Sequence, residues 1–258
     1  MKKIMPAVLM VLLLVLSLVS GCTGVTIKGS GKLVEEIFDI SDFTGIKAQN
    51  GFQVEVSESN SFSVVVSIDE NALEYIDIKK SGDMLLVRPK PNCSFRSVTM
   101  IAKITMPEIT KVEVSGGARI DASDFDSSSH LSVSLSGGSD FSGSINTGDI
   151  DATLSGGSHM DLNNSADRLK ADLSGGSHLT LSGSAEKIDI KGSGGSHFNM
   201  AEYSVKDADI NLSGGSHADV EVTGTMKGSI SGSSTVSYTG KPDTGDLEVD
   251  RDSELNSK

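Results

Sequence analysis

The sequence has 258 residues, enough for one large domain or two small ones. Only 37% of the residues are hydrophobic and 4% are aromatic, tryptophan is absent, and 28 residues are glycine. The net charge of -13 at pH 7 argues against nucleic-acid binding, which needs a surface rich in lysine and arginine, and against electrostatic attachment to anionic lipid. These properties fit an exposed protein with many turns, in which each residue buries little surface.

The first 22 residues read as an export signal. The basic start MKK precedes the apolar run IMPAVLMVLLLVLSLV, and the letters VSGC end the segment at Cys22. Small residues before a cysteine resemble a bacterial lipobox, in which Cys22 is lipidated and becomes the first residue of the mature chain. An ordinary cleaved signal and an uncleaved anchor helix are the alternatives, and the length of the apolar run favours the lipoprotein. Residues 1–22 are therefore predicted to be a lipoprotein signal peptide. This signal directs the protein to the cell membrane or outer membrane, facing the cell surface or the periplasm.

Only two cysteines are present. Lipidation of Cys22 leaves Cys93 without a partner, so the mature chain has no disulfide framework. Because Cys93 also lacks nearby catalytic or metal-binding companions, we expect it to be an inert, at least partly buried thiol.

Residues 23–110 are predicted to be an all-β N-terminal part. The segments FQVEV, FSVVVSI, YIDI, MLLVRP and VTMIAKITM are strand-like, and KKSGD between YIDI and MLLV is a hairpin turn. No linker rich in proline or serine separates this part from the remainder of the chain, so we expect one continuous structure.

Residues 111–240 are repetitive. The hexapeptide LSGGSH occurs three times, and related Ser-Gly turns recur at intervals of 18 to 21 residues. The serines that open these turns are Ser115, Ser136, Ser155, Ser174, Ser193, Ser213 and Ser231.

Apolar residues alternate with polar ones on both sides of each turn, which is the period of a β-strand. Inward positions lie one and three residues before the turn serine and five and seven residues after it. A single repeat cannot bury its one apolar face, whereas stacked repeats place these residues in columns. The predicted fold is therefore all-β: a right-handed parallel β-helix, or β-solenoid, with a longer-stranded N-terminal part. Residues 241–258 form a polar C-terminal tail, in which LEV is expected to add a strand and the last residues to fray.

The stretch FDISDFTGIKAQNGFQVEVSESNSFSVVVSIDENALEYIDIKKSGDMLLV, followed by Ser-Gly repeats, resembles the head GIN domain family, whose members are named as auto-transporter adhesins. The resemblance covers residues 28–240 and differs in its turn, where Ser-Gly-Gly-Ser-His replaces the usual Ser-Gly-Ala type. It implies a β-helical surface protein that is secreted or lipid-anchored, and it implies no enzyme activity.

Four histidines follow their turn serines at the same distance: His159, His178, His197 and His217. This position faces outward, so we expect one exposed column with Asp140 one coil below and Thr235 one coil above. Two adjacent imidazoles, completed by Asp140 or water, form a possible weak site for zinc or copper. The simpler interpretation is a structural ladder beside the glycine turn, and no resident cofactor is predicted.

Catalysis is not expected, and no catalytic residue is predicted. Asp151, Asp189 and Asp209 share an outward column, but Lys170 alternates with them as a cross-coil salt bridge would require. A carboxylate pair suited to polysaccharide cleavage is therefore not evident, and a carbohydrate-active enzyme is the weakest alternative.

The sequence thus predicts an exported, lipid-anchored interaction module. Its expected partners are the membrane, through the anchor, and an extracellular or envelope ligand that is a glycan or a protein. A metal-binding envelope protein that uses the histidine column is the second hypothesis.

Overall fold

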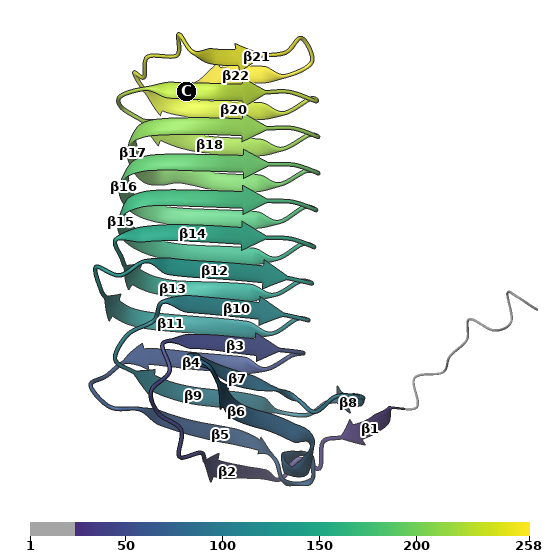
Figure 1. The fold of residues 1–258 in the computed structure, drawn as a ribbon. Helices are drawn as coiled ribbons and strands as arrows, with labels where there is room; N and C mark the ends of the chain where they lie inside the picture. Colours follow the sequence, from purple (N-terminus) through teal and green to yellow (C-terminus); the bar gives the residue numbers. More distant parts are fainter. Residues whose placement is uncertain (1–23) are drawn as a thin grey trace, which may run out of the picture.

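The computed structural model describes residues 24–258, which form a nearly all-β solenoid of about eight turns (Figure 1). Strands hold 66% of the described residues and helices 3%, so the predicted fold class is confirmed. The predicted lipidation site, Cys22, lies outside the described residues. Within residues 24–258, no helix is both long and apolar enough to cross a membrane.

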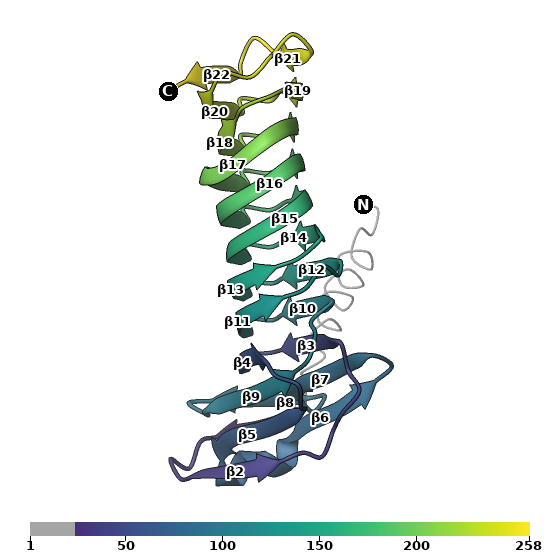
Figure 2. The same cartoon turned by 90° about the vertical axis from the view of Figure 1, so that its left-hand side faces the viewer.

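The N-terminal part contains nine strands and one short 3-10 helix. In chain order these elements are β1 (Val25–Lys28), β2 (Leu33–Ile37), β3 (Gly45–Gln49), β4 (Gln53–Glu58), β5 (Ser63–Asp69), η2 (Glu70–Tyr75), β6 (Ile76–Ser81), β7 (Met84–Pro89), β8 (Cys93–Arg96) and β9 (Met100–Met106). Here the chain departs from simple coiling, because β2 and β9 pair antiparallel with β5, and β6 forms an antiparallel hairpin with β7. Figure 2 shows these strands splaying away from the regular stack at one end of the molecule.

The repeats form the regular stack. Its strands are β10 (Lys111–Ser115), β11 (Arg119–Asp126), β12 (Leu131–Ser136), β13 (Asp140–Asn146), β14 (Asp149–Leu154), β15 (His159–Leu173), β16 (His178–Gly192), β17 (His197–Leu212), β18 (His217–Val222), β19 (Met226–Ile230), β20 (Thr235–Gly240), β21 (Leu247–Val249) and β22 (Glu254–Ser257). Strand β3 pairs parallel with β10, and β4 pairs parallel with β11. The N-terminal part and the repeats therefore form one continuous structure, as expected.

The inward columns predicted from the alternation are confirmed. Strand β15 pairs with β16 in parallel, so that Leu162 lies opposite Leu181. Side chains of the columns directly before and five residues after the turn serine are at most 3% exposed: Val114, Leu135, Leu154, Leu173, Leu212, Ile230, Ile120, Phe141, Met160, Leu179, Phe198, Ala218 and Val236. Stacking coil on coil thus buries a core that no single repeat could form.

Gly192 is the exception in the leucine column. A Cβ atom at this position would lie 2.7 Å from the ring of Phe198 and 2.8 Å from Leu212. The larger Phe198 side chain therefore occupies the space that a leucine fills in the neighbouring coils, and the core stays filled.

The Ser-Gly-Gly-Ser turn has a specific role for each residue. Gly175 and Gly176 adopt φ values of +67° and +73°, a left-handed conformation that favours glycine. The following serine points inward, and its hydroxyl donates a hydrogen bond to the carbonyl of the turn serine, as Ser177 does to Ser174 at 2.8 Å. This bond recurs in six coils, in which the inward serines are at most 1% exposed: Ser139, Ser158, Ser177, Ser196, Ser216 and Ser234.

The C-terminal tail is ordered. The segment LEV forms β21 and pairs with β19, as predicted. The expectation that the last residues fray is wrong, because β22 pairs in parallel with β20 and extends the stack to Ser257. This segment contains no turn serine followed by two glycines, so the repeat pattern of the sequence does not predict that it forms a further coil.

The inward assignment is testable with one buried and one outward residue. Leu173 is 3% exposed, so Leu173→Asp should bury an unpaired charge between two coils and lower the free energy of unfolding by more than about 3 kcal/mol. Lys170→Ala, on the outer surface of the same strand, should cost less than about 1 kcal/mol. Urea denaturation followed by circular dichroism measures both values, and equal losses would contradict the assignment.

Candidate functional site

The four repeated histidines form one outward column, which we call the histidine ladder. His159, His178, His197 and His217 lie opposite one another on β15, β16, β17 and β18, as the spacing predicted. The first three imidazoles stack face to face, with ring centroids 4.8 and 4.7 Å apart and ring planes within 6° and 9° of parallel. The three rings therefore form one stack along the outer surface of the solenoid.

The position of each ring follows from the turn before it. The backbone N–H of His178 donates to the carbonyl of Ser158 at 2.9 Å, and the other three histidines make the same bond to an inward serine one coil below. The inward serine and the outward histidine are adjacent in sequence, so strand alternation places them on opposite sides of the sheet.

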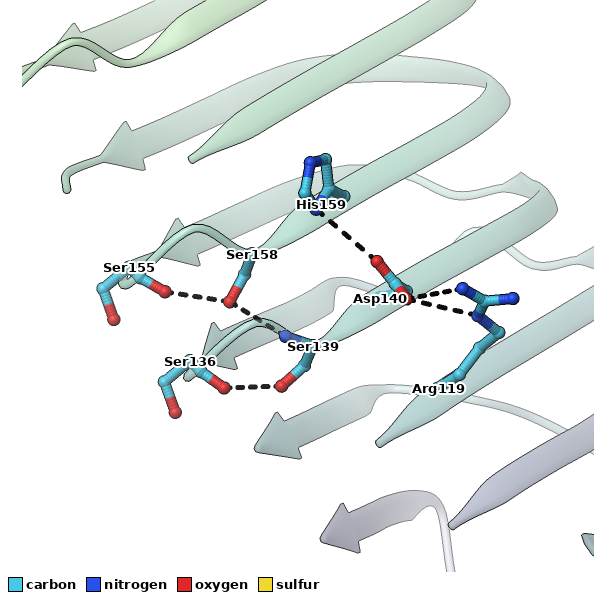
Figure 3. A network of polar contacts seen from close by, with 7 residues as sticks. All are labelled: Arg119, Ser136, Ser139, Asp140, Ser155, Ser158 and His159. Carbon is cyan, nitrogen blue, oxygen red and sulfur yellow. Dashed lines mark hydrogen bonds and ion pairs between the residues drawn. The ribbon is translucent and has the colours of Figure 1, made fainter. Parts of the chain in front are cut away.

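The lower end of the ladder is held by a chain of polar contacts (Figure 3). Asp140 lies one coil below His159, as predicted, with its Oδ1 atom 3.5 Å from Nδ1 of the imidazole. The guanidinium of Arg119 donates two hydrogen bonds to Oδ2 of Asp140, at 2.7 and 3.2 Å. Arg119 thus occupies one carboxylate oxygen and leaves the other facing the histidine.

The upper end differs, because His217 is tilted by 50° from His197 with the ring centroids 6.3 Å apart. Its Nε2 atom lies 3.2 Å from Oδ2 of Asp219, the carboxylate that also accepts a hydrogen bond from Lys258. His217 thus contacts Asp219 on its own strand and does not join the parallel stack. One coil further, Thr235 pairs with His217 as predicted.

A second outward column runs beside the ladder on the same strands. It consists of Asp161, Thr180, Asn199 and Asp219. The face formed by the two columns is therefore polar, with neutral hydrogen-bonding groups in the middle and carboxylates at both ends.

The stack has an electrostatic consequence for its second member. Partial burial, followed by the proximity of His197 and His159, lowers the pKa of the His178 imidazole below its ordinary value of 6.5. A proton on His178 would be partly withdrawn from water and would lie between the rings of His159 and His197, so the charged form of His178 is disfavoured.

The geometry constrains the predicted metal site. A metal ion bound by a histidine lies in the plane of the imidazole ring, and the nearly parallel planes of His159, His178 and His197 share no such point. The planes of His197 and His217 do cross, but Nε2 of His217 is engaged by Asp219. Among residues 24–258, no three histidine, cysteine, aspartate or glutamate side chains are grouped closely enough to hold a metal ion. Cys93 is a free, partly buried thiol.

The carboxylate column on the other long face is occupied by basic partners. Asp151, Lys170, Asp189 and Asp209 are in register on consecutive coils, as predicted. The expected salt bridges from Lys170 to the aspartates of the adjacent coils are not formed. Lys170 instead lies 4.0 Å from Asp172 on its own strand. The three carboxylates are paired elsewhere, Asp189 with Arg168 at 3.6 Å, Asp209 with Lys227 at 3.4 Å and Asp151 with His130 at 3.6 Å.

Sequence reasoning missed the residues that end the ladder. Arg119 stands four residues after Ser115, the same distance that separates the histidines from their turn serines, so the signal was present. Asp219 was also visible as the second outward residue of its strand. Lys258 carried no signal, because only the ordered tail brings it to Asp219.

The family described as "Putative auto-transporter adhesin, head GIN domain" matches residues 42–242. The chain belongs to this family. Comparison with curated proteins gives no match.

Solved structures share the fold. The chain resembles a "putative adhesin" from Parabacteroides merdae with a TM-score of 0.83 and 21% identity, over 90% of this chain and 99% of the other. It resembles a "putative adhesin" from Parabacteroides distasonis with a TM-score of 0.81 and 20% identity, over 90% and 100%. A "putative lipid binding protein" from Parabacteroides distasonis gives a TM-score of 0.86 and 17% identity, over 91% and 100%.

The lowered pKa of His178 predicts a loss of stability in acid. A histidine whose pKa is lower in the folded state binds fewer protons there than in the unfolded chain, so stability falls as the pH drops below about 6.5. Replacing His178 and His197 with Asn should reduce this dependence in thermal melts between pH 7.5 and 5. His130→Asn, outside the ladder, is the matched control, and the prediction fails if it changes the pH dependence as much as the double variant does.

Proposed function

We propose that the protein is an exported, lipid-anchored surface protein whose solenoid binds an extracellular or envelope ligand, a glycan or a protein. The observation that carries this proposal is the polar face that contains the histidine ladder. On seven consecutive coils, one outward position presents Arg119, Asp140, His159, His178, His197, His217 and Thr235 in register. Membership in a family described as adhesins supports the same class of function.

A repeated face suits a ligand that is itself extended or repetitive. Each coil offers imidazole, hydroxyl, amide or carboxylate groups at the spacing of adjacent strands, about 4.8 Å. Single contacts of this kind are weak, but a ligand that spans several coils gains from many of them at once. The groups are fixed on paired strands, so little conformational freedom is lost when a ligand binds.

The anchor rests on the sequence before the described residues. The apolar run that ends at Cys22 supports lipidation of that cysteine and retention at the membrane.

Two alternatives receive less support, and the first of them is an outcome of the test below. Metal binding stays a prediction, and it requires at least one ring of the stack to rotate. A carbohydrate-active enzyme is not favoured, because Asp151, Asp189 and Asp209 each lie beside a basic side chain.

The proposal is tested by binding the mature chain to arrays of glycans and matrix proteins, with and without added zinc. A variant with His178→Ala and Asn199→Ala on the ladder face should weaken binding to any captured ligand by about tenfold, equivalent to ~1.4 kcal/mol. Lys170→Ala with Lys191→Ala, on the other long face, is the matched control and should leave binding unchanged.

If both variants lose the same amount of affinity, the ladder face is not the binding surface. Binding that appears only with zinc, and that disappears with the histidine, would favour the metal hypothesis. Capture of no glycan or matrix protein under either condition would contradict the proposed adhesin function.

A further inference from the structure

Exposed apolar side chains gather near the beginning of the described chain. Four large hydrophobic residues are conspicuously exposed within residues 24–258: Val25 at 54%, Leu33 at 52%, Ile37 at 76% and Val249 at 40%. Three of the four lie within residues 24–37. Elsewhere on the described surface the outward positions of the solenoid are mainly polar, so this grouping requires an explanation.

The three residues lie at one end of the solenoid. Figure 1 places β1 and β2 at the end opposite β21 and β22, and Figure 2 shows β2 at the same end. Leu33 and Ile37 are four positions apart on β2, so strand alternation places them on the same face with Glu35 between them. Strand β2 pairs on one side only, with β5.

This end is firmly attached to the body of the protein. Strand β1 pairs in parallel with β8 from Val25 onward. The side chain of Asn71 donates to the carbonyl of Lys28 at 2.8 Å and accepts from the N–H of Ser30 at 3.0 Å.

Asp69 completes the attachment of the loop between β1 and β2. Asp69 is only 2% exposed. Its carboxylate accepts hydrogen bonds from the N–H groups of Gly31 at 2.6 Å and Thr99 at 2.8 Å. The two bonds lower the pKa of Asp69 below its ordinary value, so it is charged at neutral pH and the loop remains tied to the core.

The linker between the predicted lipid on Cys22 and this end of the solenoid is very short. Gly24 follows Cys22 by two residues, and an extended chain spans at most about 3.6 Å per residue. An acylated Cys22 therefore holds Gly24 within about 7 Å of the membrane surface. We propose that the N-terminal end of the solenoid rests on the lipid bilayer, with Val25, Leu33 and Ile37 at the boundary between headgroups and acyl chains. This inference depends on the lipid anchor of the proposed function.

Charge distinguishes the two ends only slightly, because residues 28–42 contain four carboxylate and two basic side chains and residues 246–258 contain five and two. The orientation therefore rests on the anchor and on the exposed apolar side chains. On β2, the carboxylate of Glu35 between Leu33 and Ile37 favours a shallow position at the headgroups over insertion into hydrocarbon. The solenoid would then project from the membrane and hold the ladder face away from it.

The absence of tryptophan allows a direct test. Ile37→Trp and Val249→Trp each introduce a single reporter at an exposed apolar position, at opposite ends of the full-length lipidated protein. In phosphatidylethanolamine and phosphatidylglycerol vesicles that contain lipid brominated near the headgroup, the emission of the Ile37→Trp variant should shift to the blue and be quenched at least twofold. The emission of the Val249→Trp variant should stay unchanged. Adding Leu33→Ser to Ile37→Trp should reduce the quenching.

Mass spectrometry of the N-terminal peptide shows whether Cys22 is acylated, and so distinguishes failure of the anchor from failure of the orientation. If Cys22 carries no acyl chains, the anchor is refuted, and the membrane orientation falls with it. If Cys22 is acylated but both reporters are quenched equally or neither is quenched, the orientation alone is refuted. A blue shift of the Ile37→Trp variant without vesicles, growing with protein concentration, would assign this end to a second copy of the chain instead.

Discussion

Parallel pairing of each coil with the next in constant register is the interaction on which the rest of this structure depends. The corner of each coil enforces that register. Gly175 has a φ of +67°, and a Cβ atom there would lie 3.2 Å from the backbone nitrogen of Gly156 in the coil below. The first corner position therefore favours glycine, whereas the second has open space around it and holds Ser233 in the last Ser-Gly turn. The inward serine that follows satisfies the carbonyl of the turn serine.

The same constraint makes the outer surface periodic. Once the corner and the inward serine are fixed, the next residue of every coil points outward at one position, and the interval of 19 residues brings His159, His178 and His197 into contact. The structural repeat therefore also places the same chemical group, an imidazole, at the same outward position of successive coils. The ends of the ladder are defined by charge, through Arg119 and Asp140 below and Asp219 and Lys258 above.

Much of the coil structure and of the ladder could be predicted from the sequence, because apolar alternation indicates strands and a fixed spacing of turns indicates stacked coils. The inward leucines, the outward histidine column and Asp140 followed from position relative to the turn serine. The partners of Lys170 did not, because a long side chain reaches along its own strand as well as across coils. The antiparallel strands of the N-terminal part and the pairing of β22 carry no Ser-Gly-Gly turn, so their place in the stack depends on tertiary contacts that a repeat pattern does not show.

Removing one whole coil tests the central claim most directly. Deleting residues 174–192 takes out 19 residues, joins Leu173 to Ser193 and keeps every column and corner in register. This shortened protein should unfold in one cooperative transition with the circular dichroism of a β-solenoid. Deleting only residues 175–184 removes about half a coil and should abolish that transition, because the coil loses its glycine corner and one of its two long faces and can no longer pair along its whole length with the coils above and below. If the 19-residue deletion fails to fold, or if both deletions fold equally well, constant register between coils does not determine this structure.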